Sequence, residues 1–105
     1  MKIINLTPHA VVINNGPTFP PSGKVARVSV QQVDDGMIDG VSVKKQTFGD
    51  IVDLPAPSPD TVYIVSSIVL AAAKAAGRND CVAPNTAQAV RDENGHIVSV
   101  PGFVR

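Results

Sequence analysis

The chain has 105 residues, enough for one domain with a core that buries about two thirds of the surface exposed on unfolding. Hydrophobic residues make up 44% of the chain and charged residues 17%, a balance that excludes intrinsic disorder. Nine Lys and Arg against nine Asp and Glu give zero net charge, so we expect no nucleic-acid polymer as a partner. We therefore predict a single folded domain over residues 1–105.

The chain contains one cysteine, Cys81, so it cannot form an internal disulfide or a cysteine-based metal cluster. Its two histidines lack metal-ligand spacing, and we predict no metal and no cofactor. The opening residues lack the apolar run of a signal peptide, and no stretch approaches the roughly 20 apolar residues that cross a membrane. We therefore expect a cytoplasmic protein that does not bind membranes.

Short strand-prone segments, separated by proline and glycine, fill the first half of the chain. A first strand is predicted at 3–6, because Pro8 removes a backbone donor and biases Thr7 toward an extended conformation. A second strand is predicted at 10–13. The proline-rich segment 17–23 that follows it is predicted to be a surface loop.

The clearest strand of the sequence is at 24–33, where apolar and polar residues alternate as in a half-buried strand. Aspartate–glycine pairs after it predict turns at 34–36 and 39–40, and hence a small meander or hairpin. A further strand is predicted at 46–54, with a bulge at Gly49.

The second half of the chain contains the one predicted helix. A β-prone segment at 61–65 leads into two serines, and an alanine-rich segment at 68–76 then ends at Gly77. Serine is a favoured N-cap and glycine a favoured residue after a helix end, so the predicted order is strand, cap, helix and stop. The helix has apolar residues on nearly every face and one charge, Lys74, so we expect it to be mostly buried.

A short strand is predicted at 81–83, and a final hairpin pairs 87–91 with 96–100 around a turn at 92–95. Together these elements predict a strand-rich α+β fold, with one principal buried helix on a mostly antiparallel sheet or partly closed barrel. We expect no parallel sheet, because only one helix is available for the crossovers that parallel strands require.

The strand-to-helix junction is the best candidate site. Ser66 and Ser67 stand where a helix start offers unpaired amides and the positive end of its dipole, which together bind phosphate or carboxylate. The simpler interpretation is that one of them only caps the helix. Beyond the helix, Arg78 could contact an anion and Asp80 could orient it or bind a ribose hydroxyl, unless the two residues simply pair with each other.

Two further candidates precede the helix. His9 follows a turn between strands, where a general base or a phosphate donor could stand, although a hydrogen-bonded structural histidine is the simpler interpretation. Arg27, like Arg91 later in the chain, lies on a predicted strand and could face either a polar cavity or solvent. The sequence pairs no nucleophile with a base, so we assign no catalytic residue.

Four segments carry a resemblance that spans nearly the whole chain: Ile3–Ala10, with its Leu-Thr-Pro-His motif, Pro20–Val28, Tyr63–Ser67 and Val90–Val98. They resemble a family of small uncharacterised proteins from bacteriophages, prophages and bacteria. That family has no established activity, so the resemblance implies a context rather than a mechanism.

The resemblance also implies a set of polar positions, which are Thr7, His9, Arg27, Ser66, Arg78 and Asp80. This chain departs from the family after the helix, in the segment 82–86. With Ser67 and Asn85 added, these residues form the predicted ligand-binding set. Arginine suits phosphate, hydroxyls and helix amides suit other ligand oxygens, and Asp or Asn suits a ribose or a base edge.

Three hypotheses follow. By analogy with small phage proteins that act against host defence, the leading one is a non-catalytic binder of a small anionic, nucleotide-like ligand, which sequesters a nucleotide immune signal. Exposed valine-rich strand edges also predict a homo-oligomer. The first alternative is a protein-interaction or minor structural phage protein that acts through its edge strands. The second is a small enzyme in which His9 is a general base near Ser66 or Asp80.

Overall fold

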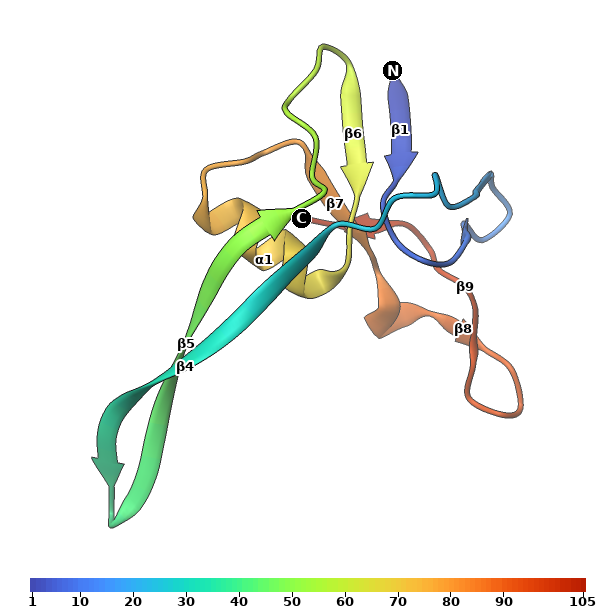
Figure 1. Ribbon diagram of the computed structural model, residues 1–105. Helices are drawn as coiled ribbons and strands as arrows, with labels where there is room; N and C mark the ends of the chain where they lie inside the picture. The colour runs from blue at the N-terminus through green and yellow to red at the C-terminus, as the bar shows by residue number, and fades with distance from the viewer.

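The computed structural model describes residues 1–105, and Figure 1 shows how its elements are arranged. The strands are β1 (Lys2–Asn5), β2 (Val11–Val12), β3 (Thr18–Phe19), β4 (Arg27–Ile38), β5 (Val41–Val52), β6 (Thr61–Ile64), β7 (Cys81–Pro84), β8 (Val90–Arg91), β9 (Ile97–Ser99) and β10 (Phe103–Val104). The α-helix α1 (Ser67–Ala75) follows β6, and the 3₁₀ helix η1 (Thr86–Gln88) follows β7. The fold is strand-rich with one α-helix, as predicted.

Four strands form the central sheet, in the order β1-β6-β7-β10. β6 lies between β1 and β7 and is parallel to both, whereas β10 pairs antiparallel with β7. The other pairs, β2–β3, β4–β5 and β8–β9, are antiparallel two-stranded sheets. Antiparallel pairing predominates, as predicted, but the sheets do not close into a barrel.

The parallel centre of the sheet contradicts the expectation that parallel pairing is absent. That expectation assumed a helix in every crossover. α1 makes the crossover from β6 to β7, but between β1 and β6 the chain returns through loops and a long hairpin, residues 6–60. A parallel pair needs only a connection of about a dozen residues or more, which is usually but not always helical. One helix therefore suffices for three parallel strands.

The central strands bury side chains on both faces of the sheet. The core on the α1 side contains Leu6, Ala26, Tyr63, Val65, Val69, Leu70, Ala73, Cys81 and Ala83. The core on the opposite side contains Val11, Ile64, Val82 and Val100. Neighbours along a strand point to opposite faces, so residues of β6 and β7 alternate between these two cores.

Local sequence sets both ends of α1. Ser66 is the N-cap, and its hydroxyl accepts a hydrogen bond from the Val69 amide at 3.4 Å. At the other end Gly77 has a φ of 85°, and the Arg78 amide donates to the Ala73 carbonyl at 2.9 Å. Four of the nine helix residues are buried, so α1 covers the sheet with one face and a mostly buried helix is not confirmed.

β4 and β5 form a long two-stranded hairpin that projects from the rest of the molecule (Figure 1); we call residues 27–52 the arm. Only its base contacts the core, through residues that include Val28 and Ile51. Every residue from 29 to 42 is exposed. The radius of gyration is accordingly 16.1 Å, whereas a compact domain of 100 residues has about 13 Å.

The arm confirms part of the predicted meander and differs from it in two details. The strand predicted at 24–33 is buried only near its start, and beyond that it is solvent-exposed. The turn predicted at 39–40 is confirmed, because the φ values of Asp39 and Gly40, 52° and 79°, match a type I′ hairpin turn. The predicted turn at 34–36 is instead an irregularity within β4. A register shift is found where a bulge was predicted, at Gly49. A Cβ at this position would collide with the hydroxyl group of Ser29 on the opposite strand.

Candidate anion-binding groove

Parallel pairing brings the carboxyl ends of β1, β6 and β7 to one edge of the central sheet. The segments that follow these strands include Thr7–His9, Ser66–Ser67 and Asn85–Thr86. In open sheets of parallel strands, ligands bind outside this edge. Five of the eight predicted ligand residues lie in these segments, for a topological reason that the sequence alone did not reveal.

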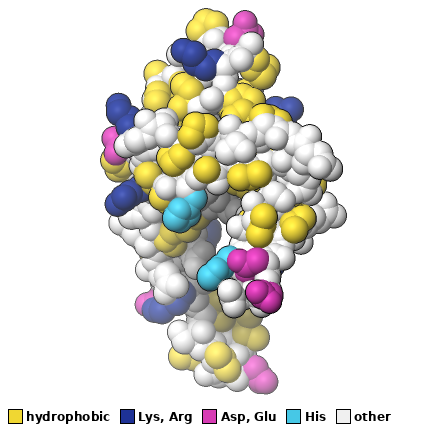
Figure 2. Space-filling view, turned by 90° about the vertical axis from the view of Figure 1, so that its right-hand side faces the viewer, with side chains coloured by type: hydrophobic (Ala, Val, Ile, Leu, Met, Phe, Trp, Pro, Cys, Tyr) yellow, Lys and Arg dark blue, Asp and Glu magenta, His cyan; other side chains and the backbone are white.

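A groove of about 770 Å³ lies at this edge. Figure 2 looks into it, and a hollow is visible between the two histidine side chains in cyan. Four predicted ligand residues line the groove, namely Thr7, His9, Ser66 and Ser67. Asn85 lies in the chain between two further lining residues, Pro84 and Thr86.

The wall that carries Thr7 and His9 is held by a buried asparagine, Asn5, at the end of β1. Its side-chain amide donates to the carbonyls of His9 at 2.8 Å and Phe19 at 2.9 Å. Its side-chain oxygen accepts from the Thr7 amide at 2.9 Å and from the Thr7 hydroxyl at 2.6 Å. The single hydroxyl hydrogen of Thr7 is thus used inside the loop. Thr7 therefore shapes this wall rather than donating to an anion.

The start of α1 forms a second wall. Ser66 and Ser67 are exposed and line the groove. The amides of Ser67 and Ile68 have no acceptor within the helix, and the Ser66 hydroxyl accepts only from the next amide, that of Val69. No acidic residue lies in the first turn. The positive end of the helix dipole therefore faces the groove without a counter-charge on its own helix.

The β8–β9 hairpin forms a third wall. The Nη1 atom of Arg91 donates to the Gly95 carbonyl at 2.8 Å, which leaves the remaining guanidinium N–H groups available to a ligand. The His96 side chain is 80% exposed, and its Nδ1 atom lies 3.8 Å from a carboxylate oxygen of Asp92. Together with His9, these residues give the groove one arginine, two histidines and no acidic lining residue.

An apolar strip lies beside these polar walls. Val12, Ile97 and Val98 line the groove and remain 36%, 46% and 52% exposed. Binding sites for small molecules combine such apolar surface with a few placed polar groups. The groove therefore has the composition to hold a ligand with one charged end and one flat, weakly polar part.

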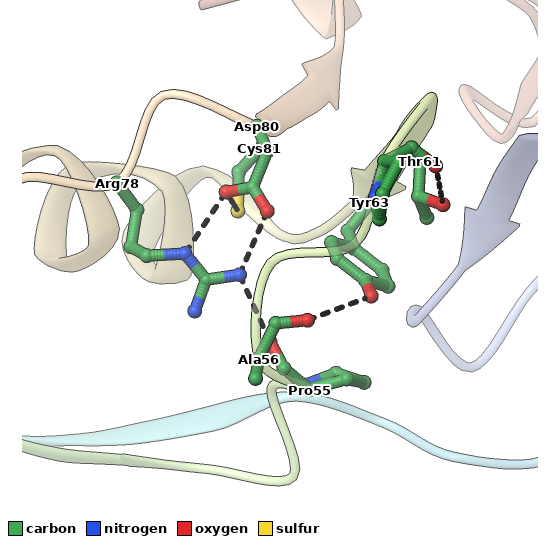
Figure 3. A network of polar contacts seen from close by, with 8 residues as sticks. Pro55, Ala56, Thr61, Tyr63, Arg78, Asp80 and Cys81 are labelled. Carbon is green, nitrogen blue, oxygen red and sulfur yellow. Dashed lines mark hydrogen bonds and ion pairs between the residues drawn. The ribbon is translucent and has the colours of Figure 1, made fainter. Parts of the chain in front are cut away.

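Arg78 and Asp80 lie outside this groove and bind each other (Figure 3). The Nε and Nη2 atoms of Arg78 donate to the two carboxylate oxygens of Asp80 at 2.9 and 2.8 Å, and Nη2 also donates to the Pro55 carbonyl at 2.9 Å. The hydrogen bonds from Arg78 lower the pKa of Asp80, and those to Asp80 raise the pKa of Arg78. This pair ties the end of α1 to the segment before β6.

Two other residues of interest also lie away from the groove. Arg27 is at the exposed base of the arm, where it pairs with Val52 in the β4–β5 ladder, and it lines neither of the two main cavities. Cys81 is buried next to Asp80, and desolvation raises the pKa of its thiol to about 11. The thiol is therefore protonated at neutral pH.

The residues of the enzyme hypothesis share no hydrogen bond. The contacts of His9 are made by its backbone carbonyl, while the Ser66 hydroxyl accepts from the helix and the Asp80 carboxylate is bound by Arg78. No three His, Cys, Asp or Glu side chains are placed to hold a metal ion. Neither helix of the structure has the length and hydropathy that a membrane crossing needs.

Asn5 is absent from the predicted ligand set, although it positions two members of that set. The sequence did contain a signal for this role of Asn5. An asparagine side chain often accepts a hydrogen bond from the backbone amide two residues later, which forms an Asx-turn. Arg91 and His96 also line the groove without being in the set. They reach it only because the chain after β9 pairs with the segment after β2, at the bridge between Ile13 and Val100.

No family model, curated protein or solved structure matches this chain. The functional assignment therefore rests on the groove and on the side chains that line it.

Proposed function

We propose that this protein is a non-catalytic binder of a small anionic, nucleotide-like ligand, held in the groove at the carboxyl edge of β1, β6 and β7. The observation that carries the proposal is the groove lining, in which Arg91, His9 and His96 surround the free amides of a helix start with no acidic residue among them. A neutral protein can hold an anion in this way, because the local cluster of donors rather than the global charge attracts it.

The size and the apolar strip of the groove favour a nucleotide over inorganic phosphate. A volume of about 770 Å³ lies within the roughly 300–1,000 Å³ of small-molecule sites. The phosphate is expected at the start of α1, where Arg91 can supply a charge-assisted hydrogen bond. The base is expected against Val12, Ile97 and Val98, with Asn85 near its edge.

The biological setting that we propose is a phage or prophage protein in the host cytoplasm that sequesters a nucleotide immune signal. Two points support it: the resemblance carried by the Leu-Thr-Pro-His segment, and a groove in which His9 is not hydrogen-bonded to a nucleophile. Sequestration requires tight binding without turnover, so the ligand should be recovered unchanged.

The test is a thermal-shift scan of the purified protein against mononucleotides, cyclic nucleotides, cyclic dinucleotides, cyclic ADP-ribose isomers and inorganic phosphate. A ligand at 100 times its Kd adds about 2.7 kcal/mol, which raises the Tm of a domain of this size by roughly 10–20 °C. We expect a selective shift with one nucleotide class. Shifts below 1 °C with every compound, from a protein that melts cooperatively, would contradict the proposal.

Two arginine variants locate the binding site. Arg91→Ala should reduce affinity at least tenfold, because it removes the permanent charge of the groove. Arg27→Ala is the matched control, since this arginine is also exposed but lies outside the groove, and it should bind like the wild type. Chromatography of the ligand after incubation separates binding from turnover. Conversion that His9→Ala abolishes would favour the enzyme alternative.

A further inference from the structure

The arm is an isolated two-stranded hairpin whose length is unusual for a structure without a partner. Each of its strands has 12 residues, and the sheet contains no third strand. A lone hairpin is only marginally stable in water, and its two open edges are templates for further pairing. The arm is therefore expected to gain much of its order from a surface that this chain does not provide.

The tip of the arm is apolar. Residues that pair in the antiparallel ladder have their side chains on the same face of the hairpin, so those of Ile38 and Val41 lie next to each other. Val33 lies beyond the irregularity in β4, and its side chain is on this face as well. These three side chains are 69%, 66% and 47% exposed, and Met37 on the other face is 73% exposed. Large apolar side chains exposed close together at one end of the molecule are more typical of an interaction site than of a free surface.

A second apolar feature lies at the base of the arm. A groove of about 660 Å³ separates β5 from α1 and is lined by Phe48, Ile51, Leu54, Ala72, Ala75 and Ala76, together with three other residues. We call it the basal groove. About ten residues of extended strand separate Ile51 from the tip, which is roughly 30 Å. The tip therefore cannot fold back into the basal groove of its own chain (Figure 1).

We propose that two copies of this chain exchange arms, so that the apolar tip of each occupies the basal groove of the other. A two-fold axis makes both contacts at once and closes the assembly as a dimer. The tip supplies four exposed apolar side chains, Val33, Met37, Ile38 and Val41, and the basal groove supplies six apolar lining residues. The same chain carries both complementary surfaces, and only a second copy can bring them together.

The first experiment measures mass by light scattering on a size-exclusion column. The full chain should elute as a dimer of about 22 kDa, twice the 10.9 kDa of one chain. Ile38→Lys, at an exposed position of the tip, should give a monomer that still unfolds cooperatively, with a loss of strand signal limited to the arm. Val90→Lys is the matched control, because Val90 is 48% exposed on β8 and lies outside both surfaces. A monomeric wild type, or a dimeric Ile38→Lys variant, would overturn the proposal.

The second experiment distinguishes arm exchange from a simple arm-to-arm contact. Ala75→Lys places a long side chain in the basal groove at an exposed position of α1 where lysine is compatible with the helix, and it should also give a monomer. A mixture of Ile38→Lys and Ala75→Lys retains one intact tip and one intact basal groove, so it should form a heterodimer. A mixture that stays monomeric would overturn arm exchange.

This inference does not depend on the proposed ligand. None of the residues that form the tip or the basal groove lines the anion-binding groove. A ligand-induced thermal shift that is the same in the wild type and in Ile38→Lys would separate the two proposals experimentally.

Discussion

The two polar clusters at opposite ends of the parallel strands differ in what their hydrogen-bonding groups contact. At the amino end of β7, Arg78 and Asp80 use both carboxylate oxygens and two guanidinium nitrogens on each other and on Pro55. At the carboxyl end, the amides that start α1 and most of the Arg91 guanidinium have no partner within the chain. The first cluster is complete, whereas the second can accept a ligand.

A polar residue near a sequence motif can bind a ligand only where its hydrogen-bonding groups are not already used within the protein. Arg78, Asp80 and Ser66 were all members of the ligand set predicted from the sequence. A buried or half-buried charged group needs a partner within the protein. Its hydrogen bonds to that partner stabilise the fold and are not available to a ligand. We therefore expect substitutions in the first cluster to change the free energy of unfolding, and those in the second to change ligand affinity.

The largest loss of stability is expected from Asn5→Ala. It removes the side chain that binds the His9 and Phe19 carbonyls and the Thr7 amide, and leaves these backbone groups without partners, at a cost of about 3 kcal/mol. Urea unfolding measures this value. Asn79→Ala, at an exposed asparagine, is the control and should change stability by less than about 0.5 kcal/mol. An equally small change in stability for Asn5→Ala would mean that the Thr7–His9 loop keeps its conformation without the Asn5 side chain.

Arg78→Ala should cost about 2 kcal/mol, because it leaves the half-buried Asp80 carboxylate without its charge-assisted hydrogen bonds. Arg91→Ala should cost less than about 0.5 kcal/mol, since its main protein contact is one exposed hydrogen bond within a hairpin. Ligand affinity should show the reverse order. Equal losses of stability in the two variants would remove the distinction between the clusters.

The burial of Cys81 predicts a loss of stability at high pH. The folded state holds the thiol proton more tightly, because its pKa is about 11 against 9.0 for an unperturbed thiol. The stabilisation is therefore complete below about pH 9 and is lost as the pH rises through 11. Urea unfolding at pH 8, 9, 10 and 11 measures this decline, which Cys81→Ala should reduce. A thiol that reacts with iodoacetamide at pH 8 as fast as in the unfolded chain would contradict the assignment.

The smallest effect is expected at the start of α1. Ser66→Ala removes the N-cap at a cost of about 0.5–1 kcal/mol, at the low end of the usual range because the bond to the Val69 amide is long at 3.4 Å. Ser67→Ala is the control and should be nearly neutral, since this side chain makes no hydrogen bond within the chain. Thermal unfolding compares the two variants. A larger loss of stability for Ser67→Ala than for Ser66→Ala would mean that Ser67 is the N-cap.

Much of the candidate site could be predicted from the sequence where it depends on local chemistry. Ser66 and Ser67 were identified from a helix start, His9 from a turn and Thr7 from the family resemblance, and all four line the groove. The grouping of these residues with Arg78 and Asp80 was not reproduced, because helix α1 carries the latter pair to the opposite end of the sheet. Spacing along the chain does not show at which end of a strand a residue lies relative to its neighbours in space.

The features that residue types alone specify are local. The cap at Ser66, the stop at Gly77 and the hairpin turn at 92–95 each depend on hydrogen bonds between residues a few positions apart, and such contacts can be deduced from residue types. The parallel pairing of β1 with β6 and the exposure of the arm depend instead on long-range packing. They depend on which apolar faces bury each other across more than 50 residues of chain, and alternation in one strand does not specify its partner.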